Sequence, residues 1–364
     1  MRALQWSLVA LLVGVPGREA AAGPCDALQA LRLPQATIRT AHVIPAGTFV
    51  LPADAPRVSS DFFTAFTRLR EFCRVEGVIR PSADSHIEFE LWLPTSAWNT
   101  KYVGAGNGGY SGSINYYRLA EAVNAGYAAS ATDTGHRSAV DDRTWAIGHP
   151  EKLIDYEHRA IHETAQKSKA LIQAFYDRAI ARSYFNSCSN GGRQGLTEAV
   201  MYPADYDGIL AGAPFITPNL TDLTAFARRG GKIVIYHGAN DTPQPTVDYY
   251  NGLTETLGRA SVEDFVRLFV IPEMGHCGGG PVPDFGTRLW PRLDGANSIF
   301  AALERWVETG SAPGSITALK FNTDGDPASG VLRSRPLCPF PKEARWQGPG
   351  SRDSASSYSC VTPN

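Results

Sequence analysis

Three residues in the second half of the chain have side chains that together could perform nucleophilic catalysis. Ser189 lies in the run NSCSNGG at 186–192, Asp241 follows in HGAND at 237–241, and His276 lies in EMGHC at 273–277. A serine hydroxyl becomes an effective nucleophile when a neighbouring base accepts its proton, and an imidazole does this near neutral pH. A carboxylate beside the imidazole fixes its tautomer and stabilises the imidazolium. We therefore predict acyl transfer with Ser189 as nucleophile, His276 as base and Asp241 as the group that orients His276.

The order and placement of these residues strengthen the prediction. Each alone has an ordinary interpretation, as a polar loop serine, a turn aspartate or a surface histidine. Together they appear as Ser, Asp, His along the chain, each just after a strand candidate, and this is the order of the α/β-hydrolase fold. In open α/β sheets, ligands bind beyond the carboxyl ends of the strands.

The residues around the serine predict a sharp strand-to-helix turn and two donors for a developing oxyanion. Small residues two positions before and after the nucleophile allow that turn; Gly191 satisfies the later position, whereas Ser187 replaces the usual glycine. The backbone N–H of Asn190 is one expected donor. The second is expected from Gly108 or Gly109, because the glycine-rich loop 106–109 follows an early strand candidate; a simple tight turn is the alternative.

The elements that must position these residues alternate along the chain. The sequence predicts helices at 152–176 and 297–309, and it predicts strands at 87–93, 101–105, 126–132, 183–186, 208–211, 232–237 and 266–271. This alternation indicates a doubly wound, mostly parallel α/β sheet. Residues 25–69 are expected to wrap the core, and the Gly-, Pro- and Ser-rich tail from 311 to be held by a disulfide.

Composition and the N-terminus indicate an exported globular enzyme. The 364 residues are 43% hydrophobic with a formal net charge of −2, and no basic stripe supports a nucleic-acid partner. Residues 1–22 resemble a signal peptide, with Arg2, an apolar stretch and small residues at 20–22; a disordered or anchored N-terminus is the alternative. We expect a secreted or periplasmic protein with one catalytic domain at 23–364 and no membrane association.

Six cysteines follow the N-terminal segment, and an even count in an exported chain favours disulfides. Six cysteines can form three disulfides in 15 different ways, and the sequence alone does not choose among them. Cys188 and Cys277 directly adjoin Ser189 and His276, so a disulfide between them would connect two loops at the reaction centre. No cofactor or metal is expected: His158 and His162 have ligand spacing on a helix, but a third ligand is missing from the motif, which favours a structural role.

Several motifs together resemble the tannase and feruloyl esterase family, which includes the hydrolase of mono(2-hydroxyethyl) terephthalate. The matching segments span nearly the whole mature chain: GNGG at 106–109, DTGH at 133–136, RAIH at 159–162, GGRQG at 191–195, DGILAGAP at 207–214, GGKI at 230–233 and RPLCP at 335–339. The resemblance implies the roles given above for Ser189, Asp241 and His276. It also implies three disulfides, Cys188–Cys277, Cys25–Cys73 and Cys338–Cys360, and a small-molecule ester of an aromatic acid as substrate.

The chain departs from the family where members usually carry a large lid domain. Only the short segment 215–231 separates the strand that ends near GAP from the strand that precedes Asp241. In the family, the lid supplies much of the aromatic-acid pocket and holds a structural calcium. We therefore expect an open, shallow site with weak substrate discrimination and no calcium requirement.

Two other functions and several further residues are compatible with the sequence. A low-selectivity aryl or short-chain esterase is the alternative enzyme, and a non-catalytic ligand-binding relative is the alternative of another class. Asp133 and His136 are interpreted as residues that line the site or brace its loop. Trp98, Tyr110 and Trp145 are interpreted as core residues or as contacts for an aromatic ring.

Overall fold

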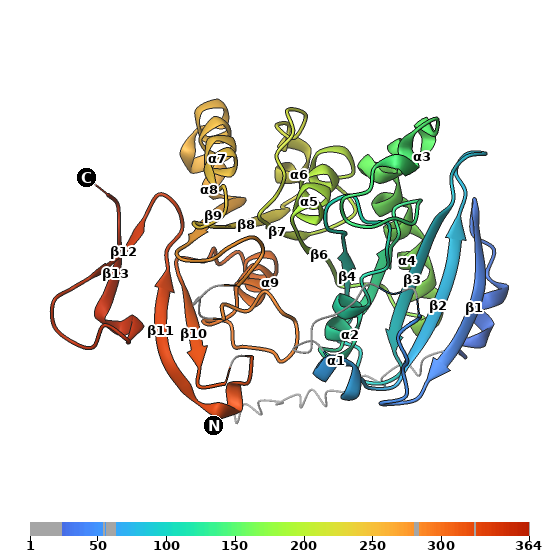
Figure 1. Ribbon diagram of the computed structural model, residues 1–364, viewed down its shortest axis with the longest axis horizontal. Helices are drawn as coiled ribbons and strands as arrows, with labels where there is room; N and C mark the ends of the chain where they lie inside the picture. The colour runs from blue at the N-terminus through green and yellow to red at the C-terminus, as the bar shows by residue number, and fades with distance from the viewer. Residues whose placement is uncertain (1–23, 54, 56–62, 280–283, 324, 364) are drawn as a thin grey trace, which may run out of the picture.

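A nine-stranded mixed sheet forms the centre of the molecule. The computed structural model describes residues 24–53, 55, 63–279, 284–323 and 325–363; the signal peptide expected at 1–22 lies outside these residues. The strand order is β1-β2-β3-β5-β4-β6-β7-β8-β9 (Figure 1). Strands β1 (Ala36–Ile44), β2 (Phe72–Ile79) and β3 (Ile87–Pro94) pair antiparallel with their neighbours.

The remaining strands of this sheet run parallel and supply the edge on which the predicted site residues lie. They are β5 (Ala128–Thr132), β4 (Lys101–Ala105), β6 (Arg182–Cys188), β7 (Gly208–Gly212), β8 (Lys232–Gly238) and β9 (Val266–Ile271). Strands such as β7 and β8 are almost entirely buried, because helices cover both faces of a parallel sheet.

Two hydrophobic clusters, one on each face, hold the helices against the sheet. One cluster includes residues of α4 (Ala160–Tyr176), α5 (Asn190–Met201), α7 (Gln244–Leu257) and α8 (Arg259–Glu263). The other includes residues of α1 (Phe63–Thr67), α2 (Tyr116–Asn124) and α9 (Ile299–Thr309). This doubly wound arrangement confirms the fold class predicted from the alternating pattern.

The helix predicted at 152–176 is interrupted. It consists of α3 (Pro150–Ile154), a wide π-helical turn at Asp155–Arg159, and α4. Within the turn, the buried Asp155 accepts a hydrogen bond from Arg159 at 2.6 Å. Such wide turns insert a residue into the helical repeat, so a period of 3.6 does not reveal them.

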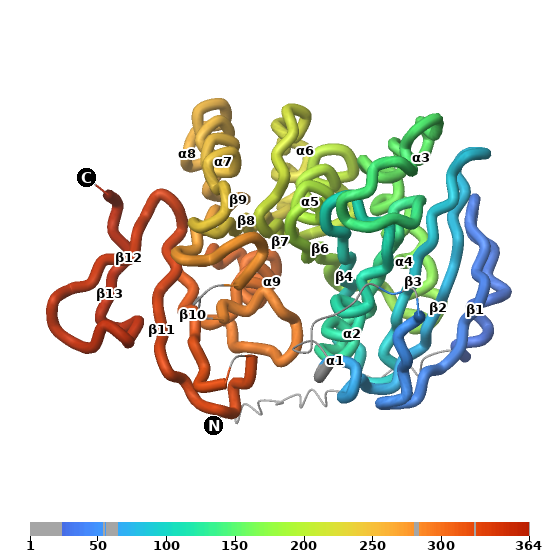
Figure 2. Tube along the Cα trace, viewed as in Figure 1, coloured from blue at the N-terminus to red at the C-terminus, as the bar shows by residue number. Residues whose placement is uncertain are grey.

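The N-terminal and C-terminal regions contain more regular structure than their sequences indicated. Residues 25–69 include the edge strand β1 and helix α1, besides a 3₁₀ turn at Asp26–Ala30. The tail forms two hairpins, β10 (Ile316–Phe321) with β11 (Val331–Leu337) and β12 (Glu343–Trp346) with β13 (Tyr358–Val361). Figure 2 shows these hairpins at the end of the molecule opposite β1. A short helix, α6 (Thr224–Arg228), precedes β8.

Candidate active site

Ser189 occupies a sharp turn between β6 and α5. Its backbone has φ 65° and ψ −128°, a conformation that non-glycine residues rarely adopt and that recurs where a side chain must be presented for function. The Ser189 N–H donates to Gly212 O on the neighbouring strand β7 at 2.8 Å, and this bond holds the turn in place. The half-buried Ser189 thereby lies just beyond the carboxyl end of β6.

The small residues around Ser189 are required by close contacts. A Cβ atom on Gly191 would lie 2.0 Å from Ser187 Oγ, and one on Gly192 would lie 2.4 Å from Gly212 O. Ser187 therefore fits at its position, where the usual motif has glycine, because Gly191 has no side chain. The substitution leaves the turn intact.

The structure brings Ser189, Asp241 and His276 together. His276 Nε2 lies 2.8 Å from Ser189 Oγ, and its Nδ1 lies 2.6 Å from Asp241 Oδ2. A neutral ring that donates its Nδ1 proton to the carboxylate has a free lone pair on Nε2 to accept the serine proton. The three residues come from the ends of β6, β8 and β9, so the sheet itself sets their spacing.

A second histidine, which the sequence reasoning missed, supports the carboxylate. His237, at the end of β8, places Nε2 3.0 Å from the same Asp241 Oδ2 and Nδ1 2.8 Å from Thr246 Oγ1. Burial lowers the pKa of His237, which keeps it neutral. Although desolvation opposes ionisation, the hydrogen bonds from His276 and His237 hold the pKa of Asp241 below its ordinary value, so the carboxylate stays charged.

Three disulfides join the six cysteines in the pairs that the family resemblance implies. They are Cys25–Cys73, Cys188–Cys277 and Cys338–Cys360. Cys188–Cys277 links the end of β6 to the loop after β9, directly beside Ser189 and His276. It therefore fixes covalently the two loops whose side chains must meet.

The glycine-rich loop after β4 is anchored to the helix that begins beside Ser189. Asn107 N–H donates to the side-chain Oε1 of Gln194 on α5 at 3.0 Å, and Tyr156 OH donates to Gly109 O at 2.8 Å. Within the described part of the chain, the N–H groups of Asn190, Gly108 and Gly109 have no hydrogen-bond acceptor. Gly108 borders open space, whereas a Cβ on Gly109 would meet Val140 O at 2.5 Å.

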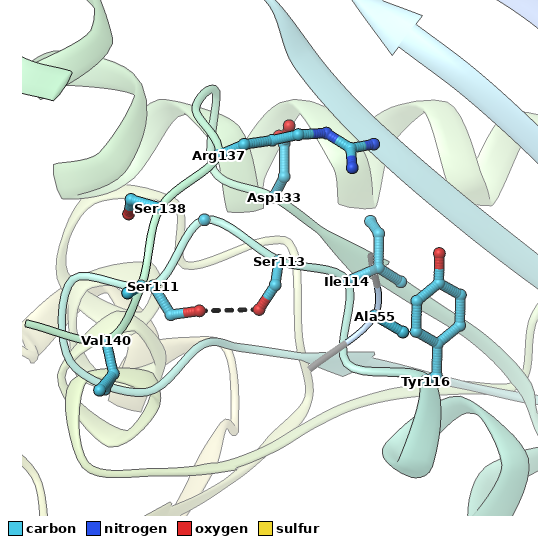
Figure 3. Close-up of a pocket in the computed structure, with 11 residues that line it drawn as sticks. Ala55, Ser111, Ser113, Ile114, Tyr116, Asp133, Arg137, Ser138 and Val140 are labelled. Atoms are coloured by element: carbon cyan, nitrogen blue, oxygen red, sulfur yellow. Dashed lines mark hydrogen bonds between the residues drawn. The ribbon is translucent and has the colours of Figure 1, made fainter. Parts of the chain in front are cut away.

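A cavity of about 530 Å³ lies along the continuation of this loop (Figure 3). Its wall combines hydroxyls, apolar groups and one guanidinium, supplied mainly by residues 111–114 and 137–140 with Tyr116 and Asp133. Ser111 Oγ and Ser113 Oγ are hydrogen-bonded at 2.7 Å on one side of it, and Arg137 extends across the other. The loop that contains Gly108 therefore also forms a wall of this cavity.

Asp133 and His136 brace this region. Asp133 Oδ1 accepts from the N–H groups of Gly135 and Glu88 at 2.8 and 2.9 Å, and His136 Nε2 lies 2.9 Å from Tyr110 O. Burial lowers the pKa of His136. These contacts hold the loops on both sides of the cavity, although Asp133 also lines it.

The aromatic residues singled out from sequence have separate surroundings. Trp98 stacks on Tyr176 against the core, with ring centroids 3.8 Å apart. Trp145 stacks on His136 at 3.7 Å, beside the loop of Tyr110. Only the second group lies near the candidate site.

Fold and site together define an α/β-hydrolase. In solved structures, the same architecture appears in an esterase from Aspergillus oryzae, with a TM-score of 0.83, 22% identity and coverage of 93% of this chain and 99% of that chain. Feruloyl esterase B from Aspergillus oryzae gives a TM-score of 0.81 at 21% identity, with coverage of 93% and 99%.

The family model described as tannase and feruloyl esterase matches residues 73–219 and 215–361. The chain therefore belongs to the tannase and feruloyl esterase family and is a carboxylic ester hydrolase. Relatives include an uncharacterized esterase of Xanthomonas campestris pv. campestris, 27% identical over 94% of this chain and 92% of that protein. A probable feruloyl esterase B-2 of Aspergillus terreus is 23% identical over 91% and 93%.

The comparisons also reveal a difference in length. The alignment with the Xanthomonas esterase runs over 537 positions although this chain has 364 residues, so that relative contains long segments that this chain lacks. The two matches to the family model meet at residues 215–219.

Proposed function

We propose that this protein hydrolyses esters of aromatic carboxylic acids, of the feruloyl, galloyl or terephthaloyl type, through an acyl-enzyme on Ser189. The observation that supports this best is the position of His276, whose ring nitrogens lie 2.8 Å from Ser189 Oγ and 2.6 Å from Asp241 Oδ2. Family membership supports the ester chemistry, and the fungal relatives, named as probable feruloyl esterases, support the aromatic acid.

In the proposed mechanism, Ser189 Oγ attacks the ester carbonyl carbon while His276 Nε2 accepts the hydroxyl proton. The bond to the alcohol oxygen then breaks, His276 returns the proton to the leaving alkoxide, and the acyl group remains on Ser189. Water attacks the acyl-enzyme as His276 takes its proton. Release of the carboxylic acid transfers that proton back to Ser189 Oγ. Asp241 stays ionised throughout.

We propose the backbone N–H groups of Asn190 and Gly108 as donors to the oxyanion. Asn190 begins α5, where the first N–H groups of a helix have no acceptor within the helix. Gly108 is preferred over Gly109 because open space lies beside it. Each such donor typically contributes about 3 to 4 kcal/mol to lowering the barrier. The ester carbonyl would then lie against the loop whose far side lines the 530 Å³ cavity, where part of the substrate can bind.

We further propose that segment 215–231 replaces the lid of longer relatives and that selectivity is weak as a result. Leu220, Leu223 and Phe226 of this segment are buried against the sheet, so it packs as a short cover. The junction of the two family-model matches lies at its start. Adding calcium to chelator-treated protein is therefore expected to leave the melting temperature unchanged.

Export is proposed from the disulfides and the N-terminal sequence. Three disulfides are typical of an oxidising compartment. Among the described residues, the structure contains no helix of the length and apolarity that crossing a membrane requires. Sequencing the N-terminus of the exported protein would test cleavage near residue 22.

The experiment that tests the proposed function compares hydrolysis of methyl ferulate, methyl gallate, mono(2-hydroxyethyl) terephthalate and a nitrophenyl acetate. The variants are Ser189→Ala and, as a matched control, Ser183→Ala at the opposite end of β6. We expect wild type and Ser183→Ala to cleave the aromatic-acid esters and Ser189→Ala to be inactive. A fluorophosphonate that labels the Ser189 peptide in wild type would support the acyl-enzyme.

The alternatives give different results. Turnover of the activated acetate alone would replace the aromatic substrate class with short-chain esters. Equal background rates for wild type and Ser189→Ala on all four esters would overturn catalysis and favour a non-catalytic, ligand-binding role.

A further inference from the structure

A second cluster of polar side chains lies away from the ester site, near the C-terminal end of α5. It contains His162 on α4, Glu198 on α5 and Asp205 in the turn before β7. One nitrogen or oxygen of each residue lies within 4.8 Å of the corresponding atom of the other two. His158, whose spacing from His162 is that of a ligand pair, is outside the cluster and instead places Nδ1 2.8 Å from Tyr202 OH.

Among the described residues, none donates a hydrogen bond to the buried carboxyl group of Glu198. Glu198 is 1% exposed, and within the described part of the chain neither of its carboxylate oxygens receives a hydrogen bond. Asp205 is equally buried, but its two oxygens are engaged by His162 Nδ1, at 2.6 Å, and by Gln166 Nε2. The neighbouring Lys169 donates to backbone O of Asp205 rather than to Glu198. Burying an uncompensated carboxylate is costly, so this pair of buried carboxyl groups is expected to hold either a proton or a cation.

We propose that His162, Glu198 and Asp205 bind one first-row divalent cation, with Zn²⁺ as the best match. Three atoms no more than 4.8 Å apart lie within about 2.8 Å of a common centre, so side-chain movements of under about 1 Å would give Zn–N and Zn–O distances of about 2.0 to 2.2 Å. One imidazole and two carboxylates form a donor set that zinc accepts, whereas calcium prefers an all-oxygen shell. The side chain of His162 is 26% exposed, which leaves a path for the ion and a water ligand.

The ion would connect three elements and would have no part in the ester chemistry. Glu198 lies nine residues after Ser189 on the same helix, so the two are about 13 Å apart along its axis. Binding would join α4 to α5 and both to the turn that leads into β7. The expected consequence is a more stable attachment of α5 to α4, independent of whether the proposed aromatic substrate and acyl-enzyme are correct.

The competing explanation is a proton shared between the carboxyl groups of Glu198 and Asp205, and metal binding distinguishes the two. Chelator-stripped, disulfide-intact protein is titrated with Zn²⁺ by calorimetry and with Co²⁺ by visible absorption. The variants are Glu198→Gln and a matched control, Glu163→Gln, which makes the same change on α4 at a residue paired with Lys167. Circular dichroism and melting in the absence of metal show whether each variant is folded.

We expect wild type and Glu163→Gln to bind one Zn²⁺ and to gain roughly 4 °C in melting temperature at about 100 times the dissociation constant. Glu198→Gln should weaken Zn²⁺ binding roughly 100-fold. Replacing a residue that only hydrogen-bonds to a metal ligand already lowers metal affinity by up to that factor. Co²⁺ should give absorption bands in wild type that are lost in Glu198→Gln. If Glu198→Gln does not fold, His162→Asn serves the same purpose at a partly exposed position. Equal binding by wild type and the folded ligand variant, or no binding by wild type, would overturn the proposal and leave the shared proton.

Discussion

Removing the Cys188–Cys277 disulfide should reduce ester hydrolysis far more than removing Cys25–Cys73 does, although both removals destabilise the protein to a similar extent. The first bond adjoins Ser189 and His276, and the second lies at β2, four strands from β6 in the sheet order and thus about 19 Å away. The two double variants, each with both cysteines replaced by serine, therefore separate a local effect on the site from a general effect on stability.

The expected loss of stability follows from the lengths of the closed loops. The bonded cysteines are 89 residues apart in Cys188–Cys277 and 48 apart in Cys25–Cys73. The loss of loop-closure entropy in the unfolded chain then corresponds to about 4.6 and about 4.1 kcal/mol. A difference of about 0.5 kcal/mol is small beside either value. Melting temperatures of the two variants should accordingly fall by similar amounts.

The expected loss of activity is local. His276 Nε2 and Ser189 Oγ are 2.8 Å apart, and a displacement of about 1 Å between reacting groups can cost about 100-fold in rate. We expect kcat/KM to fall about 10- to 100-fold without Cys188–Cys277 and less than about twofold without Cys25–Cys73. Rates are measured at 25 °C on an activated aromatic ester, with the folded fraction taken from circular dichroism. Equal losses in both variants, or none in the first, would refute a positioning role for this disulfide.

Three other substitutions test parts of the site and its support. His237→Phe removes one of the two histidine donors to Asp241 and should lower kcat/KM roughly 5- to 30-fold, with KM little changed; an unchanged rate in steady-state kinetics would contradict a supporting role. Gly106→Ala would place a Cβ 2.3 Å from Gln194 Oε1, so we expect at least about a tenfold loss of kcat with an unaltered circular dichroism spectrum. Hydrogen bonds from Arg137 and Arg39 outweigh burial and lower the pKa of Glu88 to about 2. Because this folded-state pKa lies below the unfolded value, its contribution to stability is present above about pH 4.5 and is lost as the pH falls toward 2. Urea denaturation should show a shallower decline over that range for Glu88→Gln than for wild type.

The parallel half of the sheet could be predicted because its strands have a strong signal. Segments such as 208–211 and 232–237 are short apolar runs, and both are buried on two faces in the structure. Strand β1 was missed because only two of its nine residues are buried, so its pattern does not differ from that of a loop. The β12–β13 hairpin was missed for the same reason, since every residue of β12 is exposed.

The ester-site residues that were predicted differ from those that were missed in the sequence signal that reveals their contacts. Ser189, Asp241 and His276 could be found because strand order brings the ends of β6, β8 and β9 to one edge. The sequence indicated only that His237 is the last residue of a buried strand. Because it lies four residues before Asp241, its side chain nevertheless reaches the Asp241 carboxylate. Glu198 and Asp205 gave no signal at all, because they meet His162 only through the packing of α5 on α4.

The arrangement of the chain separates the chemistry of the site from its selectivity. The ends of the parallel strands, the disulfide beside them and the loop at 106–109 supply every group of the proposed reaction, and all lie within the sheet and its immediate connections. Segment 215–231, in contrast, contributes Phe226 to the core and leaves Phe215 68% exposed beside the site edge. A shorter segment at this point leaves every member of the hydrogen-bonded Ser189–His276–Asp241 group in place. The proposed weak selectivity and the hydrogen-bonded geometry of Ser189, His276 and Asp241 therefore depend on different parts of the chain.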